Sequence, residues 1–373
     1  MRKENKDWLT LVALPGLGCG LIHRLLAAFE TPANVLAAGK AVSRVEGVGR
    51  QLTAVFTDQP LLNRARLWAQ QEYERVSAAD IHLLCSSDPS YPPLLRTIHD
   101  PPVLLYLRGN LDCLQKPSVA IIGSRAATSY GKRISSMLAG KLARAGIVVV
   151  SGLAMGIDGH AHAGSLEAGG DTVAVLGCGV DVVYPRSHTG LYEQVKERGL
   201  LVSEYPLSTR PDGFRFPARN RIISGLSMGV IVVEATCKSG SLITARLALD
   251  QGREVFAVPG RIDSKKSEGT HRLLQQGAHL VQSVDDIINE LQLAAAMHQV
   301  EPVPHAEVTP EELSGPEEQL LGCIDVYPVD IDELTVKTGF PSASLHDLLL
   351  RLEIKGRIRQ LPGQQYERVS KAS

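Results

Sequence analysis

Short runs of apolar, mostly β-branched residues recur between residues 118 and 291, and segments of helical period separate most of them. We expect strands at 119–123, 147–152, 172–177, 201–204, 229–233, 254–258 and 279–282. Strands that are apolar along their whole length are buried on both faces, and helical crossovers make neighbouring strands parallel. The sequence therefore predicts an α/β fold in which a doubly wound, mostly parallel sheet is covered by helices on both sides.

Small residues gather where these strands end. In such a Rossmann-like sheet, ligands bind at the carboxyl ends of the strands. The ends are Gly123-Ser124-Arg125, 151–158, 177–179, 203–206 and 258–260. None matches G-x-G-x-x-G after the first strand or G-x-x-x-x-G-K-[ST], so neither a dinucleotide site nor a Walker A loop is predicted. Glycines at strand ends are ordinary turn residues, but their recurrence at one edge, with cations, predicts a crevice there.

The stretch from Phe216 to Ala245 surrounds one of these strands. Aromatic and basic residues precede the strand, namely Phe214, Arg215, Phe216, Arg219 and Arg221. The small-residue turn Lys238-Ser239-Gly240-Ser241 follows it and begins a helical segment. Backbone N–H groups at such a turn can hold a phosphate, and aromatic rings among arginines add stacking surfaces. The residues alone thus predict a phosphate-binding α/β protein.

Charge does not by itself identify the ligand. The formal net charge of the 373 residues is −1, so any nucleic-acid surface must be local. Residues 210–272 contain 11 Lys and Arg and 6 Asp and Glu, a balance of 11 − 6 = +5. A solvated basic face would give the same excess.

Several classes of protein are disfavoured by composition and spacing. The six cysteines are scattered without a C-x-x-C pair, which indicates reduced thiols in a cytoplasmic protein. No stretch has the length and apolarity of a membrane span, and the N-terminus lacks the features of a signal peptide. His160 and His162 near Asp158 match no common metal-site spacing, so no metal is expected. Asp158 is expected instead to orient its turn through its side-chain oxygens.

Residues 1–80 are expected to form a helical domain that is SAM- or helix-hairpin-helix-like. Gly-apolar-Gly turns at 16–18 and 47–49 each precede a helical segment, as in helix-hairpin-helix DNA modules. A small helical bundle with glycine turns explains them equally well. The second domain is expected at 81–292, with a proline-rich lead-in at 86–117 that holds a strand at 103–107 and packs on the sheet.

The C-terminal part is expected to be a linker, 293–312, followed by a winged helix, 313–373. Its elements are helices at 317–326, 330–338 and 343–355 and a hairpin of 357–360 and 365–369 around Pro362-Gly363. The third helix is rich in leucine and carries charges of both signs. Because tight binding to a DNA backbone needs clustered cations, a protein contact or a weak DNA contact is favoured over a DNA-reading role.

The central domain resembles the DNA-processing protein A family, also called DprA or Smf. The matching segments are VAIIGSRAATSYG (119–131), the run 148–185, SEYP (203–206), FPARNRIISGLS (216–227), the run 231–260 and EGTHRLLQQGA (268–278). They cover nearly all of 118–291. The order of a helical module, this domain and a small winged helix matches as well.

The resemblance implies a protein without enzymatic activity, catalytic residues or cofactor. Family members bind single-stranded DNA that enters in natural transformation, protect it, and load a RecA-type recombinase onto it. They act as homodimers through the Rossmann-like domain. Carried over to this sequence, the DNA pocket consists of Gly123, Ser124, Arg125, Phe216, Arg219, Asn220, Arg221, Lys238, Ser239 and Gly240.

The resemblance also implies roles for these residues. The cations Arg125, Arg219, Arg221 and Lys238 would pair with phosphates. Backbone N–H groups of Ser124 and of Ser239-Gly240 would cradle a phosphate. Phe216 would stack on a base, and Asn220 would hold the loop or touch a base edge.

An enzymatic alternative uses the same crevice. The lysine-decarboxylase-like nucleotide phosphoribohydrolases share this fold and carry a P-G-G-x-G-T-x-x-E motif. The corresponding place here, 239–241, has neither that glycine run nor a glutamate at that spacing. A nucleotide hydrolase or sensor would take its acid–base groups from Glu234 and Asp158.

Overall fold

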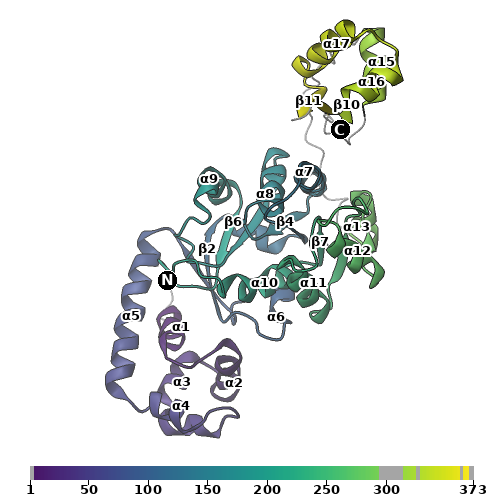
Figure 1. Ribbon diagram of the computed structural model, residues 1–373. Coiled ribbons are helices and arrows are strands. Elements are labelled where there is room, and N and C mark those ends of the chain that lie inside the picture. Colours follow the sequence, from purple (N-terminus) through teal and green to yellow (C-terminus); the bar gives the residue numbers. More distant parts are fainter. Residues whose placement is uncertain (1–3, 294–313, 325–327, 362–363, 369–373) are drawn as a thin grey trace. The chain divides into compact units, whose positions relative to one another are not determined.

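The structure is a computed structural model that describes residues 4–293, 314–324, 328–361 and 364–368 (Figure 1). Residue contacts divide the chain into two compact units, 1–301 and 302–373. The first unit contains the helical N-terminal region and the α/β domain, and the second contains the winged helix. The predicted linker lies, except for its first residue, outside the described residues.

The first unit is built on a nine-stranded sheet in the order β1-β2-β6-β5-β4-β3-β7-β8-β9. The strands are β1 (His82–Cys85), β2 (Leu104–Gly109), β3 (Ser118–Ile122), β4 (Val148–Ser151), β5 (Thr172–Leu176), β6 (Leu200–Ser203), β7 (Gly229–Val232), β8 (Glu254–Ala257) and β9 (His279–Leu280). Strands β3 to β9 pair in parallel, which confirms the mostly parallel sheet. The last predicted strand is shorter than expected and ends at Leu280.

Helices cover both faces of the sheet (Figure 1). They are α6 (Pro93–Arg96), α7 (Ser129–Arg144), α8 (Ile157–Glu167), α9 (Thr189–Arg198), α10 (Arg215–Leu226), α11 (Ser241–Asp250), α12 (Glu268–Gln275) and α13 (Val284–Glu290). Residues Val119 and Ile121 of β3 enter the core beneath α7, α8 and α13. Residues Ala120 and Ile122 enter the opposite core beneath α6, α10 and α11. Because both faces of the strand are buried, its sequence is apolar without alternation.

The order of the strands creates a switch point next to β3. The chain runs outward from β3 through β4 and β5 to β6, then returns to β7 on the other side of β3 and continues to β8 and β9. Helix α7 follows β3 on one face, and α11 follows β7 on the other face. The carboxyl ends of β3 and β7 are therefore the place where such a sheet opens a crevice for a ligand.

The lead-in packs on the sheet, as expected. Its predicted strand is β2, which pairs antiparallel with β6 and so extends the parallel sheet at one edge. Strand β1, which the sequence analysis missed, pairs antiparallel with β2. Its four residues are too few for a period-2 pattern to stand out.

The N-terminal region is helical, with α1 (Glu4–Ala13), α2 (Cys19–Phe29), α3 (Pro32–Ala37), α4 (Arg50–Val55) and α5 (Gln59–Ala78). Gly16 and Gly47 occupy turns at φ +79° and +87°, a backbone region that favours glycine. Buried side chains of these helices, such as Leu9 and Leu62, belong to one core with Tyr106 and Leu207 from the sheet domain. The helical N-terminal region and the α/β domain, which meet near residue 80, thus share a core within one compact unit.

The second unit is a winged helix, as predicted. It consists of α15 (Gly315–Cys323), β10 (Val329–Asp330), α16 (Ile331–Thr338), α17 (Ser342–Ile354), β11 (Ile358–Leu361) and β12 (Gln365–Arg368). The first helix begins earlier than expected because Ser314 and Glu317 form a capping box. Residues 325–327, the predicted turn 362–363 and residue 369 lie outside the described residues. Across the described parts of both units, no helix has the length and apolarity needed to cross a membrane.

Candidate nucleic-acid interface

A cavity of about 700 Å³ lies at the switch point of the sheet. Its walls come from the segment after β3, the start of α8, helix α10 and the turn between β7 and α11. Nine of the ten predicted site residues line it, namely Gly123, Ser124, Arg125, Phe216, Arg219, Asn220, Lys238, Ser239 and Gly240. The tertiary structure thus brings three separate stretches of predicted residues, 123–125, 216–220 and 238–240, to one cavity.

Two predicted cations and one unpredicted cation reach this cavity. Arg125 and Lys238 are exposed residues in its lining. Lys266 also lines the cavity, and its Nζ lies 3.4 Å from Ser124 Oγ. Lys266 belongs to the basic region 210–272 but was not among the predicted site residues, because the segment between β8 and α12 carries no motif. Three cations around one cavity are suited to binding a polyanion.

Aromatic rings form one wall of the cavity. The guanidinium of Arg125 lies 5.3 Å from the centroid of the Phe216 ring. Tyr184 stacks on the same ring, with 5.4 Å between centroids and 27° between planes. Tyr184 was missed because it lies well before Phe216 in sequence, although it falls within one of the matching segments. The wall thus combines a half-buried ring, Phe216, with an exposed one, Tyr184, beside a cation, and aromatic surfaces of this kind can stack on nucleic-acid bases.

Arg219 forms part of the cavity floor and is not an exposed cation. The residue is 4% exposed, and its Nη1 donates to the carbonyl oxygens of Gly152 and Val175. Gly152 has no Cβ, and a Cβ there would lie 2.6 Å from Arg219 Nη2. Burial lowers the pKa of Arg219 to about 10. Its Nε is buried without a hydrogen-bond partner among the described residues. The guanidinium thus holds the main chain at the ends of β4 and β5, and this geometry does not support its predicted direct pairing with phosphate.

Arg221 lies outside the cavity, and its predicted role as a phosphate-binding cation is not supported. Its Nη1 and Nη2 donate to the Glu204 carboxylate at 3.0 and 2.5 Å. Its Nε lies 3.6 Å from Asp100 Oδ2. Glu204 also accepts from the thiol of Cys19 in α2 at 3.3 Å. Glu204 thus joins Arg221 of α10 to Cys19 of the N-terminal helices.

The predicted phosphate cradle of backbone N–H groups is partly occupied. Ser124 N donates to Glu234 O at 2.8 Å, and Ser239 N donates to Thr236 O at 3.0 Å. The side chain of Ser241, the first residue of α11, also lines the cavity. Its Oγ is buried without a hydrogen-bond partner in the described part of the chain. A polar ligand at the start of α11 would satisfy this hydroxyl and face the positive end of the helix dipole.

Asp158 is the one acidic side chain of the predicted turn that lines the cavity. Its Oδ2 accepts from Gly152 N at 3.2 Å, which confirms that it orients the turn. Burial raises the pKa of Asp158 to about 6, and the nearby charge of Arg219 counteracts part of this effect. The turn is tight at Gly156, where φ is +79° and a Cβ would lie 2.2 Å from Ser124 O.

Glu234 does not face the cavity. Its carboxylate accepts from the backbone N–H and the hydroxyl of Thr128, the N-cap of α7, and the residue is 4% exposed. A carboxylate engaged in this way stabilises the start of a helix. The acid–base role that a nucleotide hydrolase would require of it has no support in this geometry.

The histidine pair of α8 is not arranged as a metal site. His162 is buried, its Nδ1 lies 2.7 Å from Thr172 Oγ1, and its Nε2 accepts from Leu153 N. Among the described residues, Glu254, His279 and Glu290 are the group whose ligand atoms lie close enough to hold a cation. They lie outside the cavity, and His279 directs one ring nitrogen to each carboxylate. This is the arrangement of a bridging imidazole rather than of ligands that converge on an ion.

The fold and the cavity together define a class of protein. A doubly wound sheet has a cation-bearing, aromatic-walled cavity at its switch point and is followed by a winged helix. The family model of DNA recombination-mediator protein A matches residues 82–292, and that of the DprA winged helix domain matches residues 304–364. The chain belongs to the DNA recombination-mediator protein A (DprA/Smf) family.

Individual relatives agree with this assignment. Protein Smf of Escherichia coli K12 is 42% identical over 288 residues, which cover 76% of each chain. Protein Smf of Synechocystis is 33% identical over 397 residues, covering 98% of this chain and 99% of the relative. The crystal structure of DprA from Streptococcus pneumoniae superposes with a TM-score of 0.68 at 37% identity, covering 78% of this chain and 99% of that one.

A second solved structure bears on the ligand. DNA processing protein A from Helicobacter pylori, described for its single-stranded DNA binding mode, superposes with a TM-score of 0.52 at 35% identity. It covers 57% of this chain and 96% of that chain.

Proposed function

We propose that the cavity at the switch point binds single-stranded DNA and that the chain acts as a recombination mediator without catalysing a reaction. The observation that carries this proposal is the joint presence of Arg125, Lys238 and Lys266 beside the Phe216 ring in one cavity. Phosphates would pair with the cations, and a base would stack on the aromatic wall. That the Helicobacter pylori relative is described as binding single-stranded DNA supports the proposal.

The aromatic wall favours a single strand over a duplex. In a duplex each base is stacked between its neighbours, so a protein ring can reach a base face only after the base is unstacked, at a cost of a few kcal/mol. A single strand presents its bases without that cost. The cations alone would bind either form, so the discrimination is expected to come from Phe216 and Tyr184.

The wider role is proposed from the family to which the chain belongs. It would protect single strands that enter the cytoplasm during natural transformation, and load a RecA-type recombinase onto them as a homodimer. Strand exchange by a RecA-type recombinase on DNA coated with single-strand binding protein tests the loading step. Addition of this chain should speed exchange, and an unchanged rate with a strand-binding-competent protein would contradict the loading role.

Fluorescence anisotropy with a labelled single strand of about 20 nucleotides and a matched duplex, each at two salt concentrations, tests the binding itself. We expect tighter binding of the single strand, weakened by salt and by Arg125→Ala. A well-folded protein that binds no single strand at low salt would overturn the proposal. Mononucleotides would then be the next ligands to test against the same cavity.

A further inference from the structure

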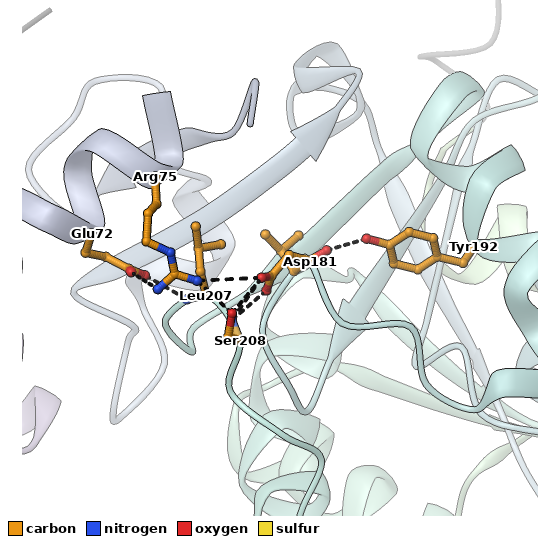
Figure 2. A network of polar contacts seen from close by, with 7 residues as sticks. Glu72, Arg75, Asp181, Tyr192, Leu207 and Ser208 are labelled. Carbon is orange, nitrogen blue, oxygen red and sulfur yellow. Dashed lines mark hydrogen bonds and ion pairs between the residues drawn. The ribbon is translucent and has the colours of Figure 1, made fainter. Parts of the chain in front are cut away.

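Glu72 is a buried carboxylate on α5 that accepts a hydrogen bond from the segment after β6, which leads to the lining of the cavity. Its side chain is 1% exposed. Its Oε1 accepts from Leu207 N at 2.7 Å, and its Oε2 accepts from Arg75 Nη1 at 3.1 Å. Figure 2 shows this carboxylate next to the Arg75 side chain and close to Leu207 of the segment after β6. A carboxylate of the N-terminal region thus holds the main chain of the sheet domain.

The contacts continue from Arg75 into a second loop of the sheet domain (Figure 2). Arg75 Nη2 donates to Ser208 Oγ at 2.6 Å and lies 4.0 Å from Asp181 Oδ2. Ser208 N donates to Asp181 Oδ1 at 2.8 Å. Ser208 has φ +60°, a conformation uncommon for serine, which its hydrogen bonds hold in place. We refer to Glu72, Arg75, Asp181, Leu207 and Ser208 as the α5 network.

The α5 network lies at the start of two further loops that contribute lining residues to the cavity. The segment 204–214 between β6 and α10 has no regular secondary structure, and its residues 211–213 line the cavity just beyond Ser208. The loop after β5 contains Asp181 and leads to Tyr184, another lining residue. Helix α5 thus contacts the start of each loop, although no residue of α5 lines the cavity.

The hydrogen bond from Leu207 N to Glu72 is buried, so its loss would cost more free energy than the loss of an exposed hydrogen bond. Leu207 is 7% exposed, and its side chain packs in the core shared with the N-terminal helices. Without the carboxylate, the Leu207 N–H would be left buried and unpaired, which is costly in free energy. The segment would relieve that cost by moving toward water, and residues 211–213 would move with it.

We propose that Glu72 is a positioning residue for the cavity, through which the N-terminal helical region sets the wall formed by residues 211–213. The inference rests on the proposed single-strand binding. Because Glu72 contacts no ligand, its loss should weaken binding through the shape of the cavity. It should leave the number of phosphate contacts, and hence the salt dependence of the affinity, unchanged.

The test compares three variants on α5 by anisotropy with the 20-nucleotide strand at several salt concentrations. Glu72→Ala should weaken binding about tenfold, which corresponds to about 1.4 kcal/mol, with the slope against log salt unchanged. Glu72→Gln keeps an oxygen that accepts from Leu207 N and should restore most of the affinity. Glu74→Ala, an exposed carboxylate on the same helix, should bind like the wild type.

A fourth variant and a second measurement distinguish a local change near the cavity from misfolding of Glu72→Ala. Asp181→Ala removes the acceptor of Ser208 N at a partly exposed site and should weaken binding in the same direction. Hydrogen exchange should become faster in residues 204–214 of Glu72→Ala and Asp181→Ala and stay unchanged in Glu74→Ala. Wild-type affinity in folded Glu72→Ala and Asp181→Ala would overturn the inference. An absence of strand binding by the wild type would instead overturn the proposed function.

Discussion

The guanidinium of Arg125 lies over the ring of Phe216, with 5.3 Å between the guanidinium carbon and the ring centroid. Arg125 belongs to the segment after β3, and Phe216 belongs to the first turn of α10. The contact joins a cation and a stacking surface from two distant parts of the sequence at the mouth of one cavity. A phosphate on Arg125 and a base on Phe216 can then be neighbours in the same strand.

Replacing Phe216 by Ala should weaken single-strand binding by about 1–3 kcal/mol, the usual contribution of one stacked base. The slope of affinity against log salt should not change, because no cation is lost. Phe216→Trp keeps the stacking surface and serves as the control. Anisotropy at two salt concentrations measures both quantities, and an alanine variant with wild-type affinity would remove the ring from the binding site.

Arg125→Ala and Lys238→Ala should each reduce the salt slope by about 0.7–1, because each removes one phosphate contact. Both residues are exposed, so thermal unfolding of the variants should match the wild type. Arg64→Ala, an exposed arginine on α5, is the matched control for loss of one positive charge. Slopes that stay at the wild-type value in both cavity variants would place the DNA elsewhere on the surface.

Arg219→Ala should lower the free energy of unfolding by about 3 kcal/mol, because it leaves the carbonyl groups of Gly152 and Val175 unpaired in the interior. Denaturation by urea measures this loss. The result would separate Arg219 from Lys238, whose removal affects binding and not stability. A stable Arg219→Ala variant with a reduced salt slope would show that the guanidinium contacts phosphate after all.

Arg221 and Glu204 should behave as a stabilising pair in a double-mutant cycle. Arg221→Ala removes the two hydrogen bonds that the guanidinium donates to the half-buried Glu204 carboxylate, and we expect the free energy of unfolding to fall by about 2 kcal/mol. Adding Glu204→Gln to that variant should recover part of the loss. The slope of DNA affinity against log salt should be the same in the wild type, the two single variants and the double variant. A lower slope in Arg221→Ala would show that Arg221 contacts the DNA.

Binding should become tighter as the pH falls from 7.5 to 5.5. Burial raises the pKa of Asp158 to about 6, so its carboxyl gains a proton over this interval and the cavity loses one negative charge. One charge removed near a phosphate should increase affinity by about threefold. Asp158→Asn, which is neutral at every pH, should bind more tightly at pH 7.5 and lack this increase. The same pH dependence in both proteins would assign the effect to another group.

Much of the sheet domain could be predicted from the sequence because its strands are buried on both faces. A continuous apolar run such as 119–122 is a local signal that needs no knowledge of its neighbours. The same holds for the glycine and serine residues at the strand ends, since a doubly wound sheet places all such ends at one edge. Nine predicted residues therefore share a cavity.

The roles of individual cations depended on structure that the sequence pattern does not contain. Arg219 and Arg221 look equivalent in the stretch FPARNRIISGLS. Helix α10 separates them by about 200° around its axis, at 100° per residue. One therefore enters the cavity floor, and the other meets Glu204 on another side of the helix. Likewise, the backbone N–H groups of Ser124 and Ser239 were predicted to donate hydrogen bonds to a phosphate, but in the folded chain they donate to backbone carbonyl oxygens.

The sequence by itself determined the α/β class, the winged helix and the edge of the sheet at which the cavity lies, because each follows from local periodicity and from the rules of parallel sheets. Only the tertiary structure decided that Lys266 and Tyr184 join the cavity and that Glu72 holds the backbone of Leu207. These are contacts between segments far apart in the chain. No local sequence pattern predicts them, because they depend on where the loops between paired strands lie relative to one another.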